Sequence, residues 1–252
     1  MARGGPKLEH GRRREMSRSF QDGGEHYHRV RPGYPAAAVD WLLPAGAHDV
    51  ADLGAGTGKF TALLLERGLQ ITAVDPSADM LAQLHLSCPA ATACLGSAEV
   101  TGLPDSAFDV VSAAQAWHWV DPVAASSEAA RILRPGGTLA LIWNQLDTTV
   151  PWVHRLSRIM HAGDVLKPDF RPAVGPEFRK LEGRQFRWED AVTTHDIVEL
   201  TKSRSYYLSA QEQTRTKVLA NLDWYLHEHL GHGDTEQLGL PYVTQAWRAT
   251  RP

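Results

Sequence analysis

The chain has 252 residues, of which 43% are hydrophobic and 22% are charged, an ordinary mixture for a globular protein. A chain of this length buries enough apolar surface to fold without disulfides or a structural metal, which excludes fibrous, unstructured and disulfide-stapled classes. Its apolar runs, such as residues 137–143, are far shorter than the roughly 18 to 20 residues that a membrane-spanning helix needs. We therefore expect one large domain that does not associate with a membrane.

The charge is divided between a basic leader and an acidic body. Residues 1–19 hold six basic and two acidic side chains, a net charge of +4, and the remaining 20 basic and 27 acidic side chains give the body a net charge of −7. Nucleic-acid affinity depends on neutralised phosphates, so we expect no nucleic-acid partner, although an Arg-rich tail of this kind can also bind nucleic acid or a membrane. The leader lacks the apolar segment of a secretory signal and is expected to be disordered, with Met16 as an alternative start.

The two cysteines, Cys88 and Cys94, have a spacing that matches no metal or redox motif. Two free thiols in a chain of this size suit a reducing compartment. The sequence therefore predicts a cytoplasmic protein with no bound metal.

Short β-like runs alternate with helical patterns from residue 20 to residue 146. We predict strands at 50–53, 70–74, 91–95, 108–113 and 138–143, and helices at 59–67, after the N-cap Ser77, and at 123–133. The last of these helices is expected to stop at Arg134-Pro135-Gly136-Gly137. Strands that alternate with helices imply a parallel sheet with right-handed crossovers.

The pattern becomes polar and less regular after Asn144, where four prolines are scattered through residues 151–176. We interpret this stretch as an inserted cap, followed by a strand at 183–191, helices at 194–203 and 209–230, and a final edge strand at 240–249. The predicted fold class is α/β, with a seven-stranded, mostly parallel sheet, an antiparallel strand at its edge and a helical cap between strands five and seven. The predicted domains are the leader (1–19), a core with an N-terminal lid (20–146), and the cap with the completion of the sheet (147–252).

A glycine turn, Asp52-Leu53-Gly54-Ala55-Gly56-Thr57-Gly58, lies between a predicted strand and a predicted helix. Its glycines permit positive φ and let a ligand approach the backbone, while the helix that follows offers free N–H groups. Asp75 ends the next predicted strand, where a carboxylate can accept both hydroxyl groups of a ribose. These features together indicate a nucleoside-binding site.

The spacing within the turn discriminates between nucleoside cofactors. A dinucleotide-binding turn has its third glycine five positions after the first, and Lys59 stands at that position here. The negative charge of Asp52 would repel a pyrophosphate but suits an ammonium group. A cofactor with a ribose at one end and an amino acid at the other fits both carboxylates, so the predicted cofactor is S-adenosylmethionine and a nicotinamide cofactor is disfavoured.

The same segments carry a family resemblance. D-L-G-A-G-T-G-K-F followed by V-D-P-S-A-D-M-L resembles the first two motifs of the class I S-adenosylmethionine-dependent methyltransferases. Gly96–Val111 looks like the family's adenine-binding segment with its fourth strand, and Leu133–Leu141 like the turn into strand five. The resemblance implies the Rossmann-like class I methyltransferase fold and an S-adenosylmethionine-dependent methyltransferase activity.

The resemblance also implies where the cofactor lies. The methionine end is expected against Gly54 and Gly56, the ribose on Asp75 and the adenine near Pro76 and Ala98. Many members have Asp where this chain has Ser97, so the bond to the adenine amino group must come here from Ser97, Glu99 or the backbone. The predicted cofactor-binding residues are Tyr27, Arg31, Asp52, Gly54, Ala55, Gly56, Thr57, Gly58, Asp75, Pro76, Ser97, Ala98, Glu99 and Gln115.

Four further segments resemble a narrower branch, the one related to trans-aconitate methyltransferases. They are Arg31–Pro35 (R-P-G-Y-P), Ala114–Asp121 (A-Q-A-W-H-W-V-D), Ser203–Tyr206 (S-R-S-Y) and residues 240–249 (L-P-Y-V-T-Q-A-W-R-A). The branch implies a small-molecule acceptor, and we expect a carboxylate or hydroxyl oxygen to receive the methyl group.

Methyl transfer from a sulfonium is an in-line displacement, in which the enzyme mainly aligns the reactants and excludes water. A carboxylate acceptor needs no base, whereas a hydroxyl can need one, and His118 is the candidate, unless it only packs between Trp117 and Trp119. Either tryptophan could form an aromatic wall or belong to the core. The predicted substrate residues are Trp119, Arg204 and Tyr206, with Arg204 holding a carboxylate or, alternatively, forming a surface salt bridge.

Two other functions stay open on the sequence alone. An RNA methyltransferase is disfavoured by the acidic body, and a protein that binds S-adenosylmethionine without catalysis differs only in lacking an acceptor cavity. The oligomeric state and the identity of the acceptor cannot be predicted from the residues.

Overall fold

The computed structural model describes residues 31–161 and 170–252 and contains a seven-stranded sheet in the order β3-β2-β1-β4-β5-β7-β6. The core elements are α3 (Ala36–Leu42), β1 (Asp49–Leu53), α4 (Lys59–Leu65), β2 (Gln70–Asp75), α5 (Ala78–Ser87), β3 (Thr92–Leu95), β4 (Phe108–Ala114), α6 (Pro122–Ile132) and β5 (Leu133–Leu146). The elements that follow are α7 (Pro151–Ile159), β6 (Arg179–Val192), α8 (Thr194–Lys202), α9 (Ser205–Ser209), α10 (Glu212–Asp223), the π-helix η1 (Trp224–His229) and β7 (Leu238–Thr250).

The sheet confirms the predicted fold class, with one correction. β1 to β5 pair in parallel, and β7 is antiparallel to both of its neighbours, β5 and β6. The predicted placing of the final strand at the edge is therefore wrong, because β6 covers it. β6 has the charged, half-exposed sequence R-K-L-E-G-R-Q-F-R-W-E-D, a composition that protects a free sheet edge from pairing with another chain.

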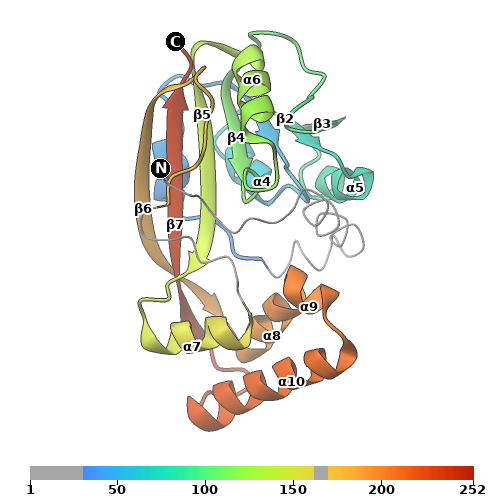
Figure 1. The fold of residues 1–252 in the computed structure, drawn as a ribbon, viewed down its shortest axis with the longest axis vertical. Coiled ribbons are helices and arrows are strands. Elements are labelled where there is room, and N and C mark those ends of the chain that lie inside the picture. Colours follow the sequence, from blue (N-terminus) through green and yellow to red (C-terminus); the bar gives the residue numbers. More distant parts are fainter. Residues whose placement is uncertain (1–30, 162–169) are drawn as a thin grey trace.

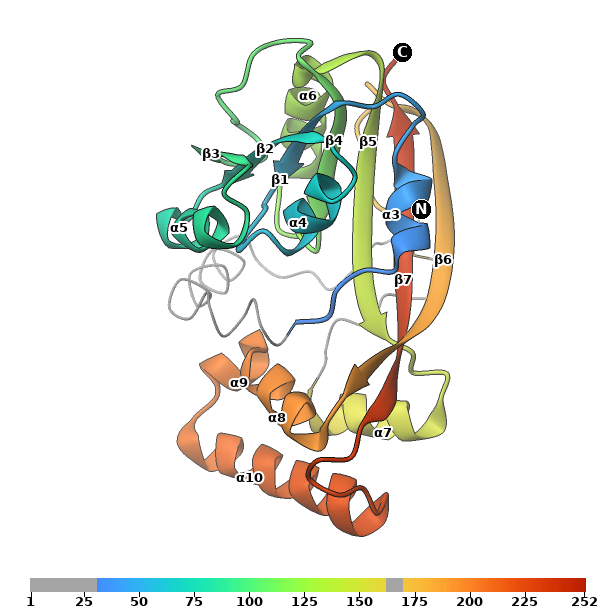
Figure 2. The same ribbon diagram turned by 180° about the vertical axis from the view of Figure 1, so that it is seen from behind.

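Apolar clusters fill both faces of the sheet. One lies under α6 and the other under α3, α4 and α5, and Figure 2 shows α3 against the β7 and β6 side. Local signals fix several helix starts. Ser77 accepts a hydrogen bond from the Met80 N–H, and Asp121 accepts from two N–H groups of the first turn of α6, ahead of Pro122.

The cap has its own apolar cluster, formed by its helices and the far ends of β5 and β7, and lies below the core in Figure 1. α7 is an addition to the predicted elements, since it lies in the stretch interpreted as irregular. The helix predicted at 209–230 begins only at Glu212 and ends as the π-helix η1, while the preceding residues form the separate helix α9. Across the described ranges, no helix has the length and apolar character needed to cross a bilayer. The predicted leader (1–19) and Tyr27 lie outside the described residues.

Candidate active site

The glycine turn follows β1 at the carboxyl end of the sheet. Gly54, Gly56 and Gly58 all have positive φ, at 67°, 56° and 86°, and the N–H groups of Gly54 and Ala55 donate to the Val74 carbonyl at 2.8 and 3.1 Å. A Cβ on Gly54 would lie 2.6 Å from the Ala116 Cβ, whereas a Cβ on Gly56 would meet nothing within 4 Å. Gly54 is thus required by packing, and Gly56 borders open space above the turn.

Two other residues of the turn face the protein. Thr57 is buried and its carbonyl accepts a hydrogen bond from the Ser87 hydroxyl at 2.9 Å. A Cβ on Gly58 would lie 3.0 Å from the Cys88 Sγ. The surface that the turn can offer a ligand is therefore on the side of Ala55 and Gly56.

Asp75 ends β2 next to the turn and is tied to it. Its Oδ2 accepts from the Gly56 N–H and its Oδ1 from the Ser77 N–H, both at 2.9 Å. Burial raises the pKa of this carboxyl, although the two hydrogen bonds oppose the shift. The carboxylate is held in one position beside the open space at Gly56, where the sequence predicts a ribose.

Asp52 lies deeper than the sequence suggests. It is fully buried, and its two carboxylate oxygens accept hydrogen bonds from the Thr61 hydroxyl at 2.7 Å and the Ser112 hydroxyl at 2.8 Å. Burial raises the pKa of Asp52 to about 6, against the effect of these two hydrogen bonds. The carboxylate therefore lies beneath the turn, where it acts on a ligand through its charge and not through an open oxygen.

The predicted adenine segment is a short loop after β3. Ser97 and Val100 exchange backbone hydrogen bonds of 3.1 and 3.2 Å, Ala98 is buried, and the Glu99 carboxylate accepts from the Asp121 N–H at 3.0 Å. Glu99 is thus engaged at the start of α6, while Pro76, directly after Asp75, is exposed. Of the polar side chains predicted for the adenine, Ser97 is the better placed to donate.

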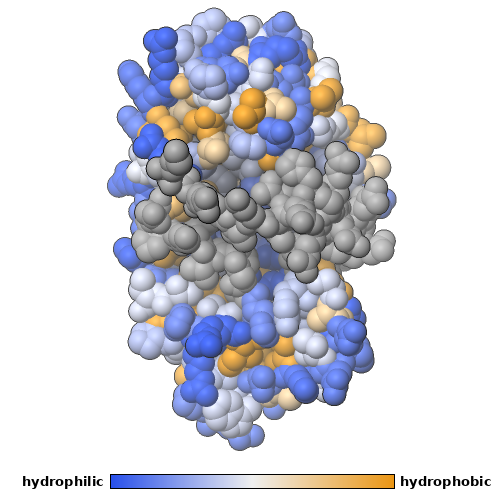
Figure 3. Space-filling model, in the orientation of Figure 1, coloured by the Kyte–Doolittle hydropathy of each residue, from blue (hydrophilic) through white to orange (hydrophobic). Residues whose placement is uncertain are grey.

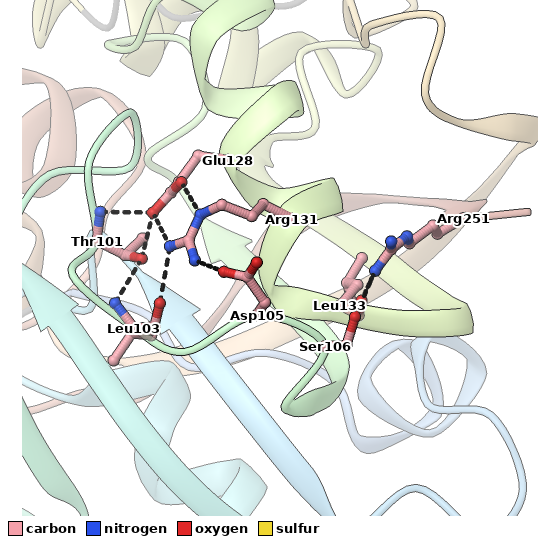
Figure 4. A network of polar contacts seen from close by, with 8 residues as sticks. All are labelled: Thr101, Leu103, Asp105, Ser106, Glu128, Arg131, Leu133 and Arg251. Carbon is pink, nitrogen blue, oxygen red and sulfur yellow. Dashed lines mark hydrogen bonds and ion pairs between the residues drawn. The ribbon is translucent and has the colours of Figure 1, made fainter.

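A polar network fixes this loop to α6 (Figure 4). The Glu128 carboxylate accepts from the Thr101 N–H and from two nitrogens of Arg131, each at 2.8 Å, and Arg131 continues to Asp105 and to the Leu103 carbonyl. The hydrogen bond from Arg131 is the main reason that the pKa of Glu128 falls to about 2. The loop that should hold the adenine is therefore anchored by a nearly buried carboxylate.

Replacing Glu128 by alanine should lower the free energy of unfolding by about 2 to 3 kcal/mol, because the Thr101 N–H and Arg131 lose their shared acceptor. The lowered pKa means that this contribution is complete above pH 4.5 and is lost as the pH falls toward 2. Urea unfolding at pH 7 measures the loss. Ser127→Ala, on the exposed side of the same helix, is the control, and an equal loss in both variants would contradict the anchoring role.

The loop after β4 lies against the turn through Ala116. Gln115, the residue before it, has a φ of 53°, a left-handed conformation that a non-glycine residue adopts at a cost. Its N–H donates to the Ile142 carbonyl and its side-chain amide to the Asn144 carbonyl, both at 2.9 Å. The strained backbone is thus held by β5, at the position where the sequence predicts the methionine end of the cofactor.

His118 is exposed on this loop, and its Nδ1 lies 3.2 Å from the indole Nε1 of Trp143. An indole N–H can only donate, so Nδ1 is the acceptor and the neutral ring carries its proton on Nε2. In this tautomer Nε2 can donate a hydrogen bond but cannot accept a proton from a substrate. Trp119 lies beside it, with ring centroids 4.6 Å apart, whereas Trp117 is buried and donates to the Ala173 carbonyl, so Trp117 belongs to the core.

Residues 31–33 join the turn, the sheet and the cap. The Lys59 ammonium donates to the Arg31 carbonyl, the Arg31 guanidinium donates to the Ser203 carbonyl at 3.0 Å, and the Asn144 amide donates to the Gly33 carbonyl. Burial lowers the pKa of Lys59 to about 8. We call this junction, residues 31–33 with Lys59, Asn144 and Ser203, the seam.

The sequence assigned no role to Lys59 or Asn144. Lys59 donates to the Arg31 carbonyl, 28 positions away in the sequence, and the polar Asn144 at the end of an apolar strand was the one available signal.

The two substrate residues predicted in the cap lie in different surroundings. Arg204 is only 8% exposed and directly follows Ser203, so it lies at the seam. Tyr206 is 39% exposed and stacks on His161, with ring centroids 4.1 Å apart, toward the end of α7. The structure thus brings Arg204, but not the ring of Tyr206, toward the seam.

A parallel-sheet core with a glycine turn, a carboxylate after the next strand and a cap over the carboxyl edge defines a nucleoside-dependent α/β enzyme. Residues 51–141 match the methyltransferase domain family. An uncharacterized methyltransferase of Mycobacterium tuberculosis is 45% identical over 239 residues, which cover 94% of this chain and 98% of that protein. The chain belongs to the S-adenosylmethionine-dependent methyltransferases, and its cofactor is S-adenosylmethionine.

Two further comparisons add detail. A solved structure, assigned as a type II methyltransferase of Anaeromyxobacter dehalogenans, has a TM-score of 0.66 and 25% sequence identity, and the match covers 87% of this chain and 97% of that one. A malonyl-[acyl-carrier protein] O-methyltransferase of Pectobacterium atrosepticum is 38% identical over 101 residues, which are 39% of this chain and 40% of that protein. The first extends the likeness through the cap, and the second is confined to part of the chain.

Proposed function

We propose that the enzyme transfers the methyl group of S-adenosylmethionine to a carboxylate oxygen of a small organic acid. The observation that carries this proposal is the position of Arg204. A chain of contacts runs from the end of the glycine turn through Lys59 and Arg31 to Ser203, the residue before Arg204. A buried guanidinium near the cofactor turn suits a carboxylate, which it can bind through two parallel hydrogen bonds.

The state of His118 favours a carboxylate acceptor over a hydroxyl. With Nδ1 taken by Trp143, the neutral imidazole has no acceptor nitrogen left to remove a proton from a hydroxyl. A carboxylate is already ionised at neutral pH and needs no base. The Nε2–H of His118 can instead donate to one oxygen of the acid and orient the other toward the methyl group.

The glycine turn and Asp75 provide the features that a nucleoside with an amino-acid tail requires: open space at Gly56 and a fixed carboxylate. The bound cofactor supplies a methyl group on a positively charged sulfur. The chain's own contribution is alignment and exclusion of water, by the loop after β4 and by the seam. No general base is required.

Two resemblances agree with an acidic acceptor. The relative from Pectobacterium is by name an O-methyltransferase that acts on a malonyl group, and the segments at 31–35, 114–121, 203–206 and 240–249 resemble trans-aconitate methyltransferases. Both names describe acids with free carboxylates. They support a di- or tricarboxylic acid, or an acid attached to a larger carrier, as the first acceptors to assay.

Arg204→Gln should raise the KM for an acid acceptor at least about tenfold, since a charge-assisted pair is lost, and should leave the Kd for S-adenosylmethionine nearly unchanged. The assay follows radioactive methyl transfer from S-adenosylmethionine to trans-aconitate, malonate, benzoate and phenol, with the ester identified by mass spectrometry. Arg204→Lys should recover part of the loss because it keeps the charge without the two-pronged geometry. An unchanged KM, or methylation of phenol alone, would contradict the proposal.

A further inference from the structure

A cavity lies in the cap, between α7 and α10. It has a volume of about 540 Å³ and is lined by His154, Arg155, Arg158, Ile159, His161 and Asn221. None of the predicted cofactor or substrate residues is among these six. The cavity is therefore separate from the glycine turn, and the proposed methyl transfer gives it no role.

The lining is cationic on one helix face. His154 and Arg158 are four residues apart on α7 and lie on one side of that helix, with Arg155 beside them, and His161, just beyond the helix end at a φ of 48°, also lines the cavity. Among the described residues no carboxylate lines the cavity, and neither Arg155 nor Arg158 has an ion pair with an acidic side chain. Asp223, two residues beyond Asn221 on α10, is not among the lining residues and lies 4.0 Å from His227.

Aromatic contacts hold two of these groups in place. The Arg155 guanidinium carbon is 5.2 Å from the ring centroids of both Trp224 and Tyr225, and its Nη1 is 3.5 Å from the His229 Nε2. His161 is stacked on Tyr206. Fixed donors lose less conformational entropy when a ligand binds, so the arrangement is pre-organised for an anion.

We propose that this cavity binds a small molecule that carries a phosphate group. Two guanidinium groups match phosphate oxygens in pairs, and the imidazole rings and the Asn221 amide can donate further N–H bonds. The volume exceeds that of a bare phosphate, which leaves room for the rest of a small ester. The acidic body, with a net charge of −7 after residue 19, disfavours a long polyanion such as nucleic acid, whereas a small anion meets only the local cluster.

The surface of the cap carries polar and apolar residues side by side. In Figure 3, strongly hydrophilic residues on the lower part of the molecule border a limited apolar patch, so polar and apolar groups adjoin on the cap within a small area. A phosphate ester presents the same combination, a charged head beside a less polar body.

The test is calorimetric titration of the full chain with inorganic pyrophosphate as the probe and succinate as the dicarboxylate comparison. Arg155→Gln with Arg158→Gln should weaken pyrophosphate binding at least about tenfold, since two charge-assisted contacts are lost. The control, Arg179→Gln with Lys180→Gln, removes the same charge from exposed residues at the start of β6 and should bind pyrophosphate as the unaltered chain does. Arg158→Gln alone, at an exposed position of α7, provides a milder variant if the double one folds poorly.

The proposal is overturned if the chain does not bind pyrophosphate, if both double variants lose pyrophosphate binding equally, or if the cavity variant loses as much affinity for succinate as for pyrophosphate. The affinity of the cavity variant for S-adenosylmethionine should stay within about twofold of the unaltered chain, as expected for distant, independent sites. That second titration separates failure of this site from failure of the proposed methyl transfer.

Discussion

Gly56→Ala should raise the Kd for S-adenosylmethionine about tenfold to a hundredfold while leaving the chain folded. A methyl group at this position would meet no atom of the described residues within 4 Å, so the core does not resist it. It would instead protrude into the open space beside Asp75, where we propose that the cofactor binds. The positive φ of 56° adds backbone strain of about 1 kcal/mol, which urea unfolding measures separately.

Gly68→Ala is the matched control. Gly68 has a φ of 74°, and no atom of the described residues lies within 4 Å of its added Cβ. It belongs to the turn between α4 and β2, at the opposite end of α4 from the glycine turn. The two variants should lose similar stability, and only Gly56→Ala should lose affinity for the cofactor. Equal affinities in calorimetry would show that the open space at Gly56 is not the cofactor site.

Asp52→Asn should stabilise the ligand-free protein at pH 7.5 by about 1 to 2 kcal/mol and weaken cofactor binding at least about tenfold. The pKa of Asp52 is about 6 in the folded chain against 3.8 for an unperturbed group, so folding favours the protonated form. Its contribution to stability is complete below pH 3.8 and is lost as the pH rises through 6. An uncharged asparagine avoids the cost of the buried charge, and the Thr61 and Ser112 hydroxyls can rotate to bond it.

The stability gain should shrink when urea unfolding is repeated at pH 5, where Asp52 of the unaltered chain is mostly protonated. The affinity of the unaltered chain for S-adenosylmethionine should fall over the same range, and less steeply in Asp52→Asn, which lacks the carboxyl that takes up the proton. Glu128→Gln provides the contrast, since the pKa of that carboxyl is lowered and the same kind of substitution should destabilise. If Asp52→Asn bound the cofactor normally, the buried charge would have no part in binding.

The charge of Asp52 is thus expected to favour cofactor binding while it lowers the stability of the ligand-free chain. A buried carboxylate with only two hydroxyl partners destabilises the apo protein at neutral pH, and a nearby cation on a ligand would relieve that cost. Sequence spacing revealed the residue but not its depth, because the depth depends on Thr61 in α4 and Ser112 in β4, nine and sixty positions away.

Local patterns were sufficient for the parallel core. The apolar strands, the Ser77 cap and the Pro-Gly-Gly segment each act over a few residues, and the glycine turn needs its own φ values whatever surrounds it. The prediction that the final strand lies at the sheet edge was wrong, because the order of β6 and β7 depends on pairing between residues far apart in the sequence. β7 lies between β5 and β6, and the charged β6 is the edge strand.

The cap was less predictable for the same reason. Its helices pack on one another and on the strand ends, so α7 is stabilised by partners far along the chain. Tyr206 and Arg204 are two residues apart, yet the short helix α9 sends one ring to His161 while the other residue stays at the seam. A sequence motif can place a segment near a site without stating which side chain faces it.

Isothermal calorimetry of the full chain with S-adenosylmethionine, its demethylated product and NAD tests the central claim most directly. We expect micromolar binding of the first two ligands, weakened by Gly56→Ala but not by Gly68→Ala, and no binding of NAD. Binding of NAD, or no binding of either sulfur-containing ligand, would contradict it, since the glycine turn would then hold a different cofactor or none.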